Sequence, residues 1–380
     1  MTPPRVSVIV PTYAPGPELD HCLAAVAAQT ARVAIADVVV VDDGSPAPVV
    51  LGPVDLPVQL LRQANLGPAA ARNRALEVAR GTLVWILNDD ALPAPDCLDT
   101  LLRFYDRTAG CRSVLGAFDF LPTLLHDPFM RMVQQGTMMF AYDVMRNHAP
   151  HDWRYFWTCN ILVDLAAVHE VGAFDADCFG TRWGAEDVEL GYRLQHDLGI
   201  LTYLCREAAC GHDHLVADRQ YFDRRVALGR NLFQMYAKHG DPRVIYLPGG
   251  APYDARTHDM IGSRIAARQF TVNSLMACVQ AVFDTPNWDR GRETALFPVL
   301  RSLCELAGQE LTWQGIHSEA CEMRGLTAAP SRSGRTVLSD FDLRAISLMR
   351  AAYEVQTAGP ARIQVCDLGQ RPIATPMDEA

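Results

Sequence analysis

The stretch GTLVWILNDDALP, residues 81–93, joins an apolar run to three consecutive polar residues. A short apolar run bounded by turn-forming residues is typical of a strand buried on both faces of a sheet. The run therefore predicts a buried strand over residues 82–87. Asn88, Asp89 and Asp90 follow at its carboxyl end, so the sequence places two carboxylates where the strand stops.

Three similar strands precede this one, with helix-like segments between them. The strand-like segments are RVSVIV (5–10), ADVVVV (36–41) and VQLLR (58–62). Residues 18–29 have helical apolar spacing, and residues 67–81 form a helix of small residues. This alternation predicts βαβ units, and therefore an α/β fold with a mostly parallel central sheet and helices on both faces.

The later part of the chain has a different character. The chain of 380 residues exceeds the usual size of one domain. Beyond residue 242 the pattern is helical, and proline and glycine cluster between Leu247 and Tyr253. We expect a first domain over residues 1–247 and an α-helical C-terminal region over residues 248–380.

The C-terminal region has an apolar stripe that consists of Ile261, Ile265, Phe270, Leu275 and Val279. That stripe can be buried against the first domain or against a second copy, and we expect a homodimer.

Composition excludes several classes of protein. The formal charge of −10 is spread along the chain without a basic block, so we expect no nucleic-acid partner. The 11 cysteines include no C-x-x-C pair, which favours buried thiols in a reducing compartment. No window approaches 18 uninterrupted apolar residues, and residues 1–5 lead directly into a strand. We therefore expect a cytoplasmic protein without a transmembrane segment.

Polar clusters follow all four predicted strands. They are PTY (11–13), DDGS (42–45), NLGPAAARN (65–73) and NDD (88–90). Ligands of open parallel sheets bind beyond the carboxyl ends of the strands, so these clusters are expected to line one crevice. Any one cluster alone is explained by the turn-forming tendency of Asp and Asn. Their recurrence on consecutive strands favours a binding site.

The sequence also limits how that site can bind phosphate. Neither G-x-G-x-x-G after a strand nor G-x-x-x-x-G-K-[ST] is present, so the backbone cradles of dinucleotide and P-loop enzymes are missing. A nucleoside diphosphate bound without such a cradle needs another source of positive charge. Adjacent carboxylates supply hard oxygen ligands for Mg²⁺ or Mn²⁺, and the ion then neutralises the diphosphate.

These motifs resemble a known family. VSVIVPTY, VVVVDDGS, NLGPAAARNRAL and LVWILNDDALP are similar to the nucleotide-binding half of family 2 glycosyltransferases of the GT-A fold. VGAFDADCFGTRWGAEDVELGYRL resembles their acceptor-side half, so the resemblance covers residues 5–239. It implies a metal-dependent, inverting enzyme of the hexosyltransferase type. Two alternatives stay open, namely a retaining GT-A transferase and a catalytically silent glycan-binding or scaffold protein.

The resemblance also implies a donor site and a metal site. The donor-binding positions are Pro11, Thr12, Tyr13, Asp42, Asp43, Arg72, Asn88 and Asp89. Asp90 is expected to bind Mn²⁺ or Mg²⁺ together with His212, with His214 as the reserve ligand. Asn88 is a departure, because many members carry the first Asp of a D-x-D motif there. A zinc site made of Cys205, Cys210, His212 and His214 is conceivable but lacks ordinary finger spacing.

The acceptor half supplies the remaining expectations. Inverting transfer needs a carboxylate that takes a proton from the acceptor, and the resemblance assigns this to Asp187 with Glu186 as its neighbour. Carboxylates also favour helix N-termini for electrostatic reasons alone. Trp183, Gly184 and Asn160 are expected on the acceptor side. The donor would be a UDP-, GDP- or dTDP-linked sugar, and the acceptor a soluble natural product, peptide or glycan.

Overall fold

The computed structural model describes residues 5–136, 138–247, 251–325 and 339–358. The chain divides into two compact units, each with its own packing. The first unit comprises residues 1–126 and 137–215, and the second comprises residues 127–136 and 216–380.

The first unit is built on a sheet that contains nine strands among the described residues. They are β1 (Val6–Thr12), β2 (Ile35–Asp42), β3 (Val58–Arg62), β4 (Leu83–Leu87), β5 (Ala91–Pro93), β6 (Ser113–Phe120), β7 (Pro150–His151), β8 (Asn160–Asp164) and β9 (Thr202–His212). The order is β3-β2-β1-β4-β8-β6-β9-β5, and β7 pairs with β9. The first four strands are mutually parallel, as predicted, and antiparallel pairing begins where β4 meets β8. The predicted α/β fold class is confirmed.

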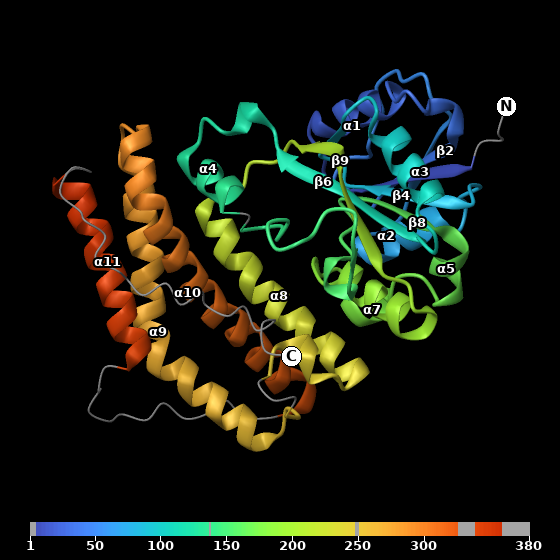
Figure 1. The fold of residues 1–380 in the computed structure, drawn as a ribbon. Coiled ribbons are helices and arrows are strands. Elements are labelled where there is room, and N and C mark those ends of the chain that lie inside the picture. Colours follow the sequence, from blue (N-terminus) through green and yellow to red (C-terminus); the bar gives the residue numbers. More distant parts are fainter. Residues whose placement is uncertain (1–4, 137, 248–250, 326–338, 359–380) are drawn as a thin grey trace. The chain divides into compact units, whose positions relative to one another are not determined.

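Helices cover both faces of this sheet (Figure 1). They are α1 (Glu18–Ala27), α2 (Pro68–Leu76), α3 (Cys97–Arg107), α5 (Leu165–Glu170), α6 (Ala176–Phe179) and α7 (Glu186–Leu198), with 3₁₀ turns at η1 (Arg32–Ala34), η2 (Pro122–Leu124) and η3 (Trp153–Tyr155). Helices α1 and α3 lie on one face, and α2, α5 and α7 lie on the other (Figure 1). Gln29 joins α1 to α3, because its side chain donates to the Ala94 carbonyl at 2.7 Å and accepts from the Leu98 amide at 2.9 Å.

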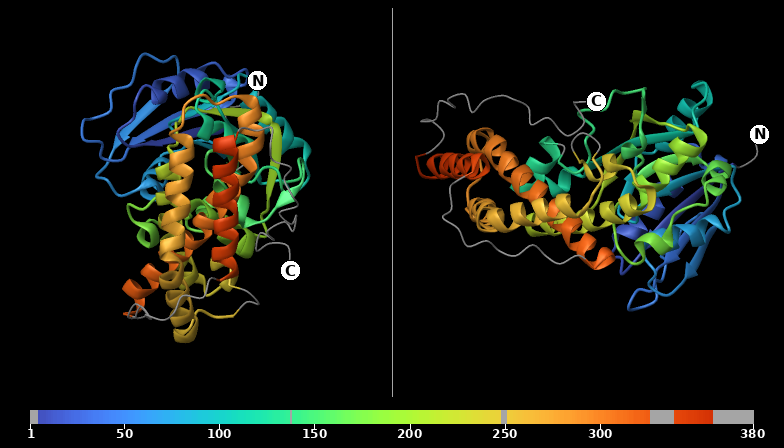
Figure 2. Two further views of the ribbon diagram at one scale, coloured as in Figure 1. Left: turned by 90° about the vertical axis from the view of Figure 1, so that its left-hand side faces the viewer. Right: turned by 90° about the horizontal axis from the view of Figure 1, so that it is seen from below.

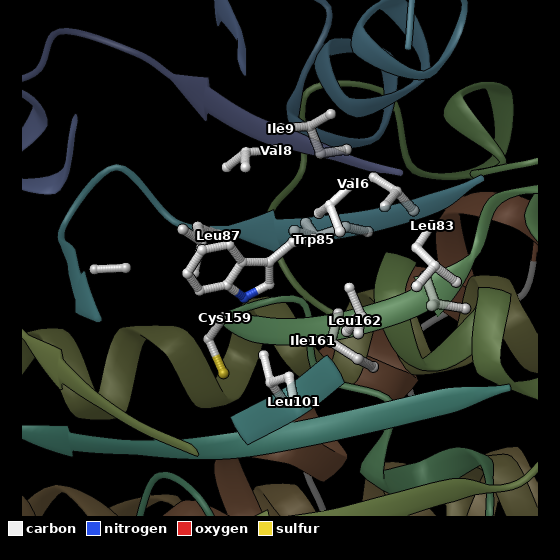
Figure 3. Packing of buried hydrophobic residues seen from close by; sticks show 14 of the residues in the cluster. Val6, Val8, Ile9, Leu83, Trp85, Leu87, Leu101, Cys159, Ile161 and Leu162 are labelled. Atoms are coloured by element: carbon white, nitrogen blue, oxygen red, sulfur yellow. The ribbon is translucent and has the colours of Figure 1, made fainter. Parts of the chain in front are cut away.

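The apolar run that predicted β4 lies in the middle of the core. All five residues of β4 are buried, and Trp85 has no exposed surface. Figure 3 shows its indole ring beside Cys159, with Ile161 and Leu162 of β8 close by. The Trp85 Nε1–H donates to Asn160 Oδ1 at 2.9 Å, which satisfies the one polar group of the indole. Burial on both faces explains why this strand is apolar throughout.

The short strand β5 follows the NDD residues and determines where they lie. It pairs antiparallel with the end of β9, and Ala91 is opposite His212. The sequence pattern does not indicate β5, because three residues are too few to show a periodicity. Through this pairing, residues 88–90 are brought next to His212, the last residue of β9, and to His214 just after it.

The second unit is helical among its described residues. It contains α4 (Pro128–Gln135), α8 (Asp218–His239), η4 (Pro242–Ile245), α9 (Ala255–Phe283), α10 (Arg290–Arg324) and α11 (Asp340–Ala358). The long helix α10 packs against α8, α9 and α11 (Figure 2). Glycines allow α8 and α10 to approach closely: a Cβ at Gly315 would lie 2.1 Å from the Val226 carbonyl oxygen, and one at Gly229 would lie 2.0 Å from that of Thr312.

The two compact units divide after Leu215, earlier than the Pro- and Gly-rich segment where the sequence suggests a boundary. Helix α8 packs on α10, where Arg230 pairs with the buried Glu319 at 3.1 Å. Helix α4 also joins this unit through the Arg131–Glu293 pair at 2.6 Å. The boundary between the units follows the packing of residues that are distant in the sequence, whereas the expected boundary depended on local Pro and Gly content.

The apolar stripe of α9 is largely buried inside the second unit. Ile261, Leu275 and Val279 are buried, whereas Phe270 is 83% exposed. Within the described ranges, no helix is both long enough and apolar enough to cross a membrane.

Candidate active site

Asp90 and His212 form the centre of the candidate metal site. Asp90 lies between β4 and β5, and its Oδ2 is 3.3 Å from His212 Nε2 and 3.9 Å from His214 Nδ1. The His212 ring is stacked on the rings of Phe118 and Phe120, with centroid distances of 4.4 and 4.9 Å. His212 is buried, and the His214 side chain is 39% exposed. The geometry brings both expected histidines to the same carboxylate.

Two buried atoms of this site have no hydrogen-bond partner among the described residues. They are Asp90 Oδ1 and His212 Nδ1. Burial raises the pKa of Asp90, but the hydrogen bond from His212 and the charges of the two histidines outweigh it, so the pKa lies below its ordinary value. An ionised carboxylate oxygen without a partner is costly to bury. Together with an imidazole nitrogen, it fits a divalent cation.

The zinc site that used the two nearby cysteines is not assembled. The Cys205 thiol is 3.6 Å from Glu207 Oε2, and the Cys210 thiol is 3.6 Å from the Gly211 carbonyl oxygen. Among the described residues, no group of metal-ligating side chains within reach of one ion joins these cysteines to His212 and His214.

Asp89 connects the NDD segment to the end of β1. The Thr12 hydroxyl donates to Asp89 Oδ2 at 2.5 Å, so two of the expected donor residues are in direct contact. Burial, followed by the charge of Asp90, raises the pKa of Asp89 to about 6, although the Thr12 hydrogen bond opposes the shift. The Asn88 side chain is half-buried, and its backbone carbonyl accepts from the Cys22 thiol.

Both carboxylate oxygens of Asp42 accept hydrogen bonds from the protein. Its Oδ1 accepts from the Ser45 amide at 2.8 Å, and its Oδ2 accepts from the Val49 amide and from Arg62. Burial raises the pKa of Asp42, but the hydrogen bonds from Ser45 and Val49 and the charge of Arg62 lower it below its ordinary value overall. Asp42 thereby fixes the loop after β2.

Asp43 has an equally complete set of partners. Its Oδ1 accepts from the Leu66 amide and the Gln63 side chain, and its Oδ2 accepts from the Gly67 amide at 2.8 Å. Gly67 begins the turn into α2 with φ +94°, and a Cβ there would lie 2.1 Å from the Gly180 carbonyl oxygen. Asp43 thus holds the loop after β3, one of the four predicted strand-end clusters.

A surface pocket of about 400 Å³ lies between the loop after β1 and the loop after β2. Ala14 and Ser45 both line it, and the Ala14 amide donates to the Ser45 hydroxyl at 2.8 Å. Beside Ala14, Tyr13 is 51% exposed, while Pro11 is half-buried. The expected donor residues at the ends of β1 and β2 therefore adjoin an open pocket.

Asp187 lies in the first turn of α7. Its carboxylate accepts from the Val188 amide at 2.8 Å and from the Thr158 amide at 3.3 Å. Thr158 is two residues before β8, whose first residue, Asn160, is opposite Leu87 of β4. The NDD residues follow Leu87 directly. Asp187 is therefore hydrogen-bonded to a segment at the same end of the sheet as Asp90. Burial, followed by the charge of Glu186, raises the pKa of Asp187 to about 6.

Glu186 and Arg72 form a buried ion pair between α7 and α2. Arg72 Nη1 lies 2.8 Å from Glu186 Oε1, and the two side chains are 5% and 3% exposed. Glu186 Oε2 accepts from the Gly184 amide at 2.7 Å, and the Arg72 guanidinium lies over the Phe174 ring. Arg72 was expected at the nucleotide. In the structure its charge is neutralised by the carboxylate next to Asp187.

The turn before α7 carries the expected acceptor residues. Gly184 has φ +101° and Ala185 has φ +71°, a conformation that is strained for alanine. Trp183 is 53% exposed at the start of this turn.

The structure places Asn160, which was expected on the acceptor side, in the core of the first unit. Asn160 has no exposed surface. Its amide nitrogen donates to the Ala117 and Ala208 carbonyls, and its amide oxygen accepts from Trp85. A side chain whose polar groups are all satisfied in the core links β4, β6 and β9, and it does not face a ligand.

Three residues that shape the site were not predicted from the sequence. Phe118 and Phe120 enclose His212, and their spacing of two in β6 is the alternation expected for one face of a strand. Thr158 contributes only its backbone amide to Asp187, so no property of its side chain could have identified it.

Comparisons with known proteins relate part of the chain to a family. Residues 7–121 match the family model "Glycosyl transferase family 2". Validoxylamine A glucosyltransferase of Streptomyces hygroscopicus is 32% identical over 234 residues, which cover 54% of each chain. Pre-mycofactocin glycosyltransferase of Mycobacterium tuberculosis is 28% identical over 232 residues, covering 56% of this chain and 45% of the relative. The chain thus spans about half the length of the curated relatives it matches.

A solved structure shows the same fold. The mannosyltransferase PcManGT from Pyrobaculum calidifontis, in complex with GDP-Man and Mn²⁺, has a TM-score of 0.51 and 19% identity, covering 85% of this chain and 88% of that chain. These comparisons show that residues 7–121 carry a glycosyltransferase family 2 domain, and that the sheet with NDD after β4 belongs to a GT-A fold.

Proposed function

We propose that the protein transfers a sugar from a nucleotide-diphosphate sugar to an acceptor, with inversion at the anomeric carbon. One observation carries the proposal: Asp187 is held by the Thr158 amide at the edge of the sheet where Asp90 faces His212. A direct displacement requires a base that activates the acceptor and a cation that stabilises the departing diphosphate. A general base and a cation site at the same end of the sheet supply both.

Each residue then has a physical task. Asp187, with its pKa raised to about 6, is ionised near neutral pH and accepts the proton of the attacking acceptor group. Glu186 is fixed by Arg72 and holds the turn at Gly184, which positions the start of α7. Trp183 offers an exposed ring face for stacking against the acceptor.

The donor side is organised by the loops after β1 and β2. We place the nucleotide base near the pocket beside Tyr13, with Pro11 and Thr12 at its inner edge and Asp42 and Asp43 holding its loops. Asp89 accepts from Thr12 and directly precedes Asp90, so Asn88 and Asp89 are assigned to the donor between the nucleotide base and the cation. Asp90 and His212 would hold Mn²⁺ or Mg²⁺, which supplies positive charge to the departing diphosphate. His214 is the reserve ligand.

A donor panel tests the proposal. UDP-, GDP- and dTDP-linked sugars, including UDP-glucose and GDP-mannose, are added to the protein with and without Mn²⁺, and thermal stability is measured. We expect stabilisation by one nucleotide class, dependent on metal. Validoxylamine A and pre-mycofactocin belong in the acceptor panel, because relatives are named for them. Other soluble natural products, peptides and glycans complete it.

The configuration of the product separates the alternatives. NMR of the anomeric centre should show inversion, whereas retention would favour a retaining GT-A transferase. Binding of a glycan without turnover of any donor, unchanged by Asp187→Asn, would favour a silent glycan-binding or scaffold protein.

We also propose that the helical unit forms a homodimer through the surface around Phe270, which is 83% exposed on α9. Light scattering of the full chain and of Phe270→Asp tests this. A dimer that the substitution converts to a monomer supports the proposal, and a monomeric wild-type protein contradicts it.

A further inference from the structure

Three metal-ligating side chains meet in the helical unit, outside the glycosyltransferase site. His258 lies in the first turns of α9, and His317 and Cys321 lie one turn apart on α10. The Cys321 Sγ is 3.7 Å from His258 Nε2 and 3.8 Å from His317 Nδ1. Both histidines are buried, and the cysteine is half-buried.

These separations resemble those of a metal centre. A tetrahedral Zn²⁺ has sulfur at about 2.3 Å and nitrogen at about 2.0 Å, which places sulfur and nitrogen roughly 3.5 Å apart. The two observed Sγ–N distances, 3.7 and 3.8 Å, differ from that edge by a few tenths of an ångström. Cys321 follows His317 by four residues, so both side chains project from the same face of α10.

The surroundings hold His258 in an orientation suited to a ligand. The Tyr253 hydroxyl lies 3.0 Å from His258 Nδ1, which leaves Nε2 directed to Cys321. Tyr253 is itself fixed, because its amide donates to the Tyr236 hydroxyl and its carbonyl accepts from Arg324. Histidine ligands characteristically use their second ring nitrogen for such a contact, which sets the ring orientation.

His317 has the freedom that binding an ion requires. Its ring lies parallel to that of His258, with centroids 4.1 Å apart, so it must turn before both lone pairs can meet at one point. Its Nε2 is buried and has no hydrogen-bond partner among the described residues. No hydrogen bond at that atom therefore opposes the rotation.

A second cluster of the same kind is weaker. His148, Cys205 and Glu207 also lie within reach of one ion, but His148 and Glu207 are exposed and already pair with each other at 2.8 Å. Burial and the Tyr253 contact distinguish the cluster on α9 and α10. We propose that His258, His317 and Cys321 bind one thiolate-preferring divalent ion of the Zn²⁺ class and thereby fasten α9 to α10.

Binding changes the protonation of the site in a defined way. The Cys321 thiol loses its proton to solvent as the metal–sulfur bond forms, and no electron is transferred. Three protein ligands leave the fourth position of a tetrahedral ion to water. The proposal does not rest on the glycosyltransferase function, because none of its three ligands belongs to the Asp90 site.

Cobalt(II) titration of the full-length, metal-free protein tests the site. A thiolate bound to tetrahedral Co²⁺ gives a charge-transfer band that carboxylate and imidazole ligands do not give. We expect this band to saturate at about one equivalent in the wild type and to be removed by Zn²⁺. Cys321→Ser should abolish it, and His317→Gln should weaken Co²⁺ affinity at least tenfold.

Two matched variants complete the test. Cys278→Ser changes a half-buried thiol on α9 outside the cluster, and Cys205→Ser removes the thiol of the weaker cluster. Both should keep the band. A wild-type protein without the band overturns the proposal, as does a band that survives Cys321→Ser or disappears in Cys205→Ser. The wild-type titration decides the question even where a variant does not fold.

Discussion

The loop after β2 and the loop after β4 both carry adjacent aspartates at a strand end, yet their carboxylates have different uses. All four carboxylate oxygens of Asp42 and Asp43 accept hydrogen bonds from the protein. Asp90 Oδ1 is buried and has no partner among the described residues. We infer that unused hydrogen-bonding capacity, more than residue type, makes a carboxylate available to a ligand.

Asp187→Asn is the change with the largest expected effect on turnover. The amide cannot accept the acceptor proton, so kcat should fall by about 10²–10⁴-fold. Stability should change little, because asparagine keeps the size of the side chain and its amide oxygen can still accept from the Val188 amide. Steady-state kinetics measures the effect. Asp197→Asn is the matched control, an exposed aspartate on the same helix. Equal activity of the two variants would exclude Asp187 as the base.

Arg72→Met tests whether the Glu186 pair belongs to the scaffold. It leaves the Glu186 carboxylate buried without its partner, so the free energy of unfolding should fall by about 3–5 kcal/mol. Urea denaturation measures this loss. The double variant Arg72→Met/Glu186→Leu should recover much of it, since no buried charge then remains. If Arg72→Met instead keeps its stability and loses nucleotide affinity, Arg72 is a donor-binding residue.

Asp42→Asn tests whether the Asp42 carboxylate stabilises the loop after β2. The amide nitrogen cannot accept from the Val49 amide or Arg62, so stability should fall by about 1–3 kcal/mol. The dependence of donor binding on metal should be unchanged. Thermal unfolding and donor titrations report the two quantities. Asp55→Asn, whose side chain is 89% exposed, is the control and should have little effect. A loss of metal dependence in Asp42→Asn would contradict the scaffold role.

The pH profile gives the smallest expected effect. A base must be deprotonated, and the pKa of Asp187 is raised to about 6, so kcat/KM should be lost as pH falls through 6. One unit below that value the rate should be about tenfold lower. Asp89, whose pKa is also raised to about 6, requires a check. The acid limb should persist in Asp89→Asn, and a limb near pH 4 would argue against Asp187.

The sequence predicted the strands because strands buried on both faces are apolar throughout. β1, β2 and β4 lie where the runs indicated, and the strand-end clusters of the first four strands point to the site. Strand β5 and the enclosure of His212 by Phe118 and Phe120 depend on pairing between distant segments. Local sequence patterns do not indicate which distant segments pair.

Asn160 shows the main limit of residue-based site prediction. An asparagine near the acceptor half has the chemistry of a binding residue, but its amide is fully satisfied by three strands. The same limit applies to Arg72, which the sequence associated with the nucleotide and the structure pairs with Glu186. Whether a polar side chain is available for a ligand depends on its partners, and those come from the three-dimensional fold.

The most direct test of the account is nucleotide binding by three proteins with and without Mn²⁺. Isothermal titration with UDP, GDP and dTDP compares the wild type, Asp90→Asn and Asp42→Asn. We expect metal-dependent binding of one nucleotide in the wild type and in folded Asp42→Asn, and loss of that metal dependence in Asp90→Asn. Metal-dependent binding that survives in Asp90→Asn would contradict the assignment of the cation to the loop after β4.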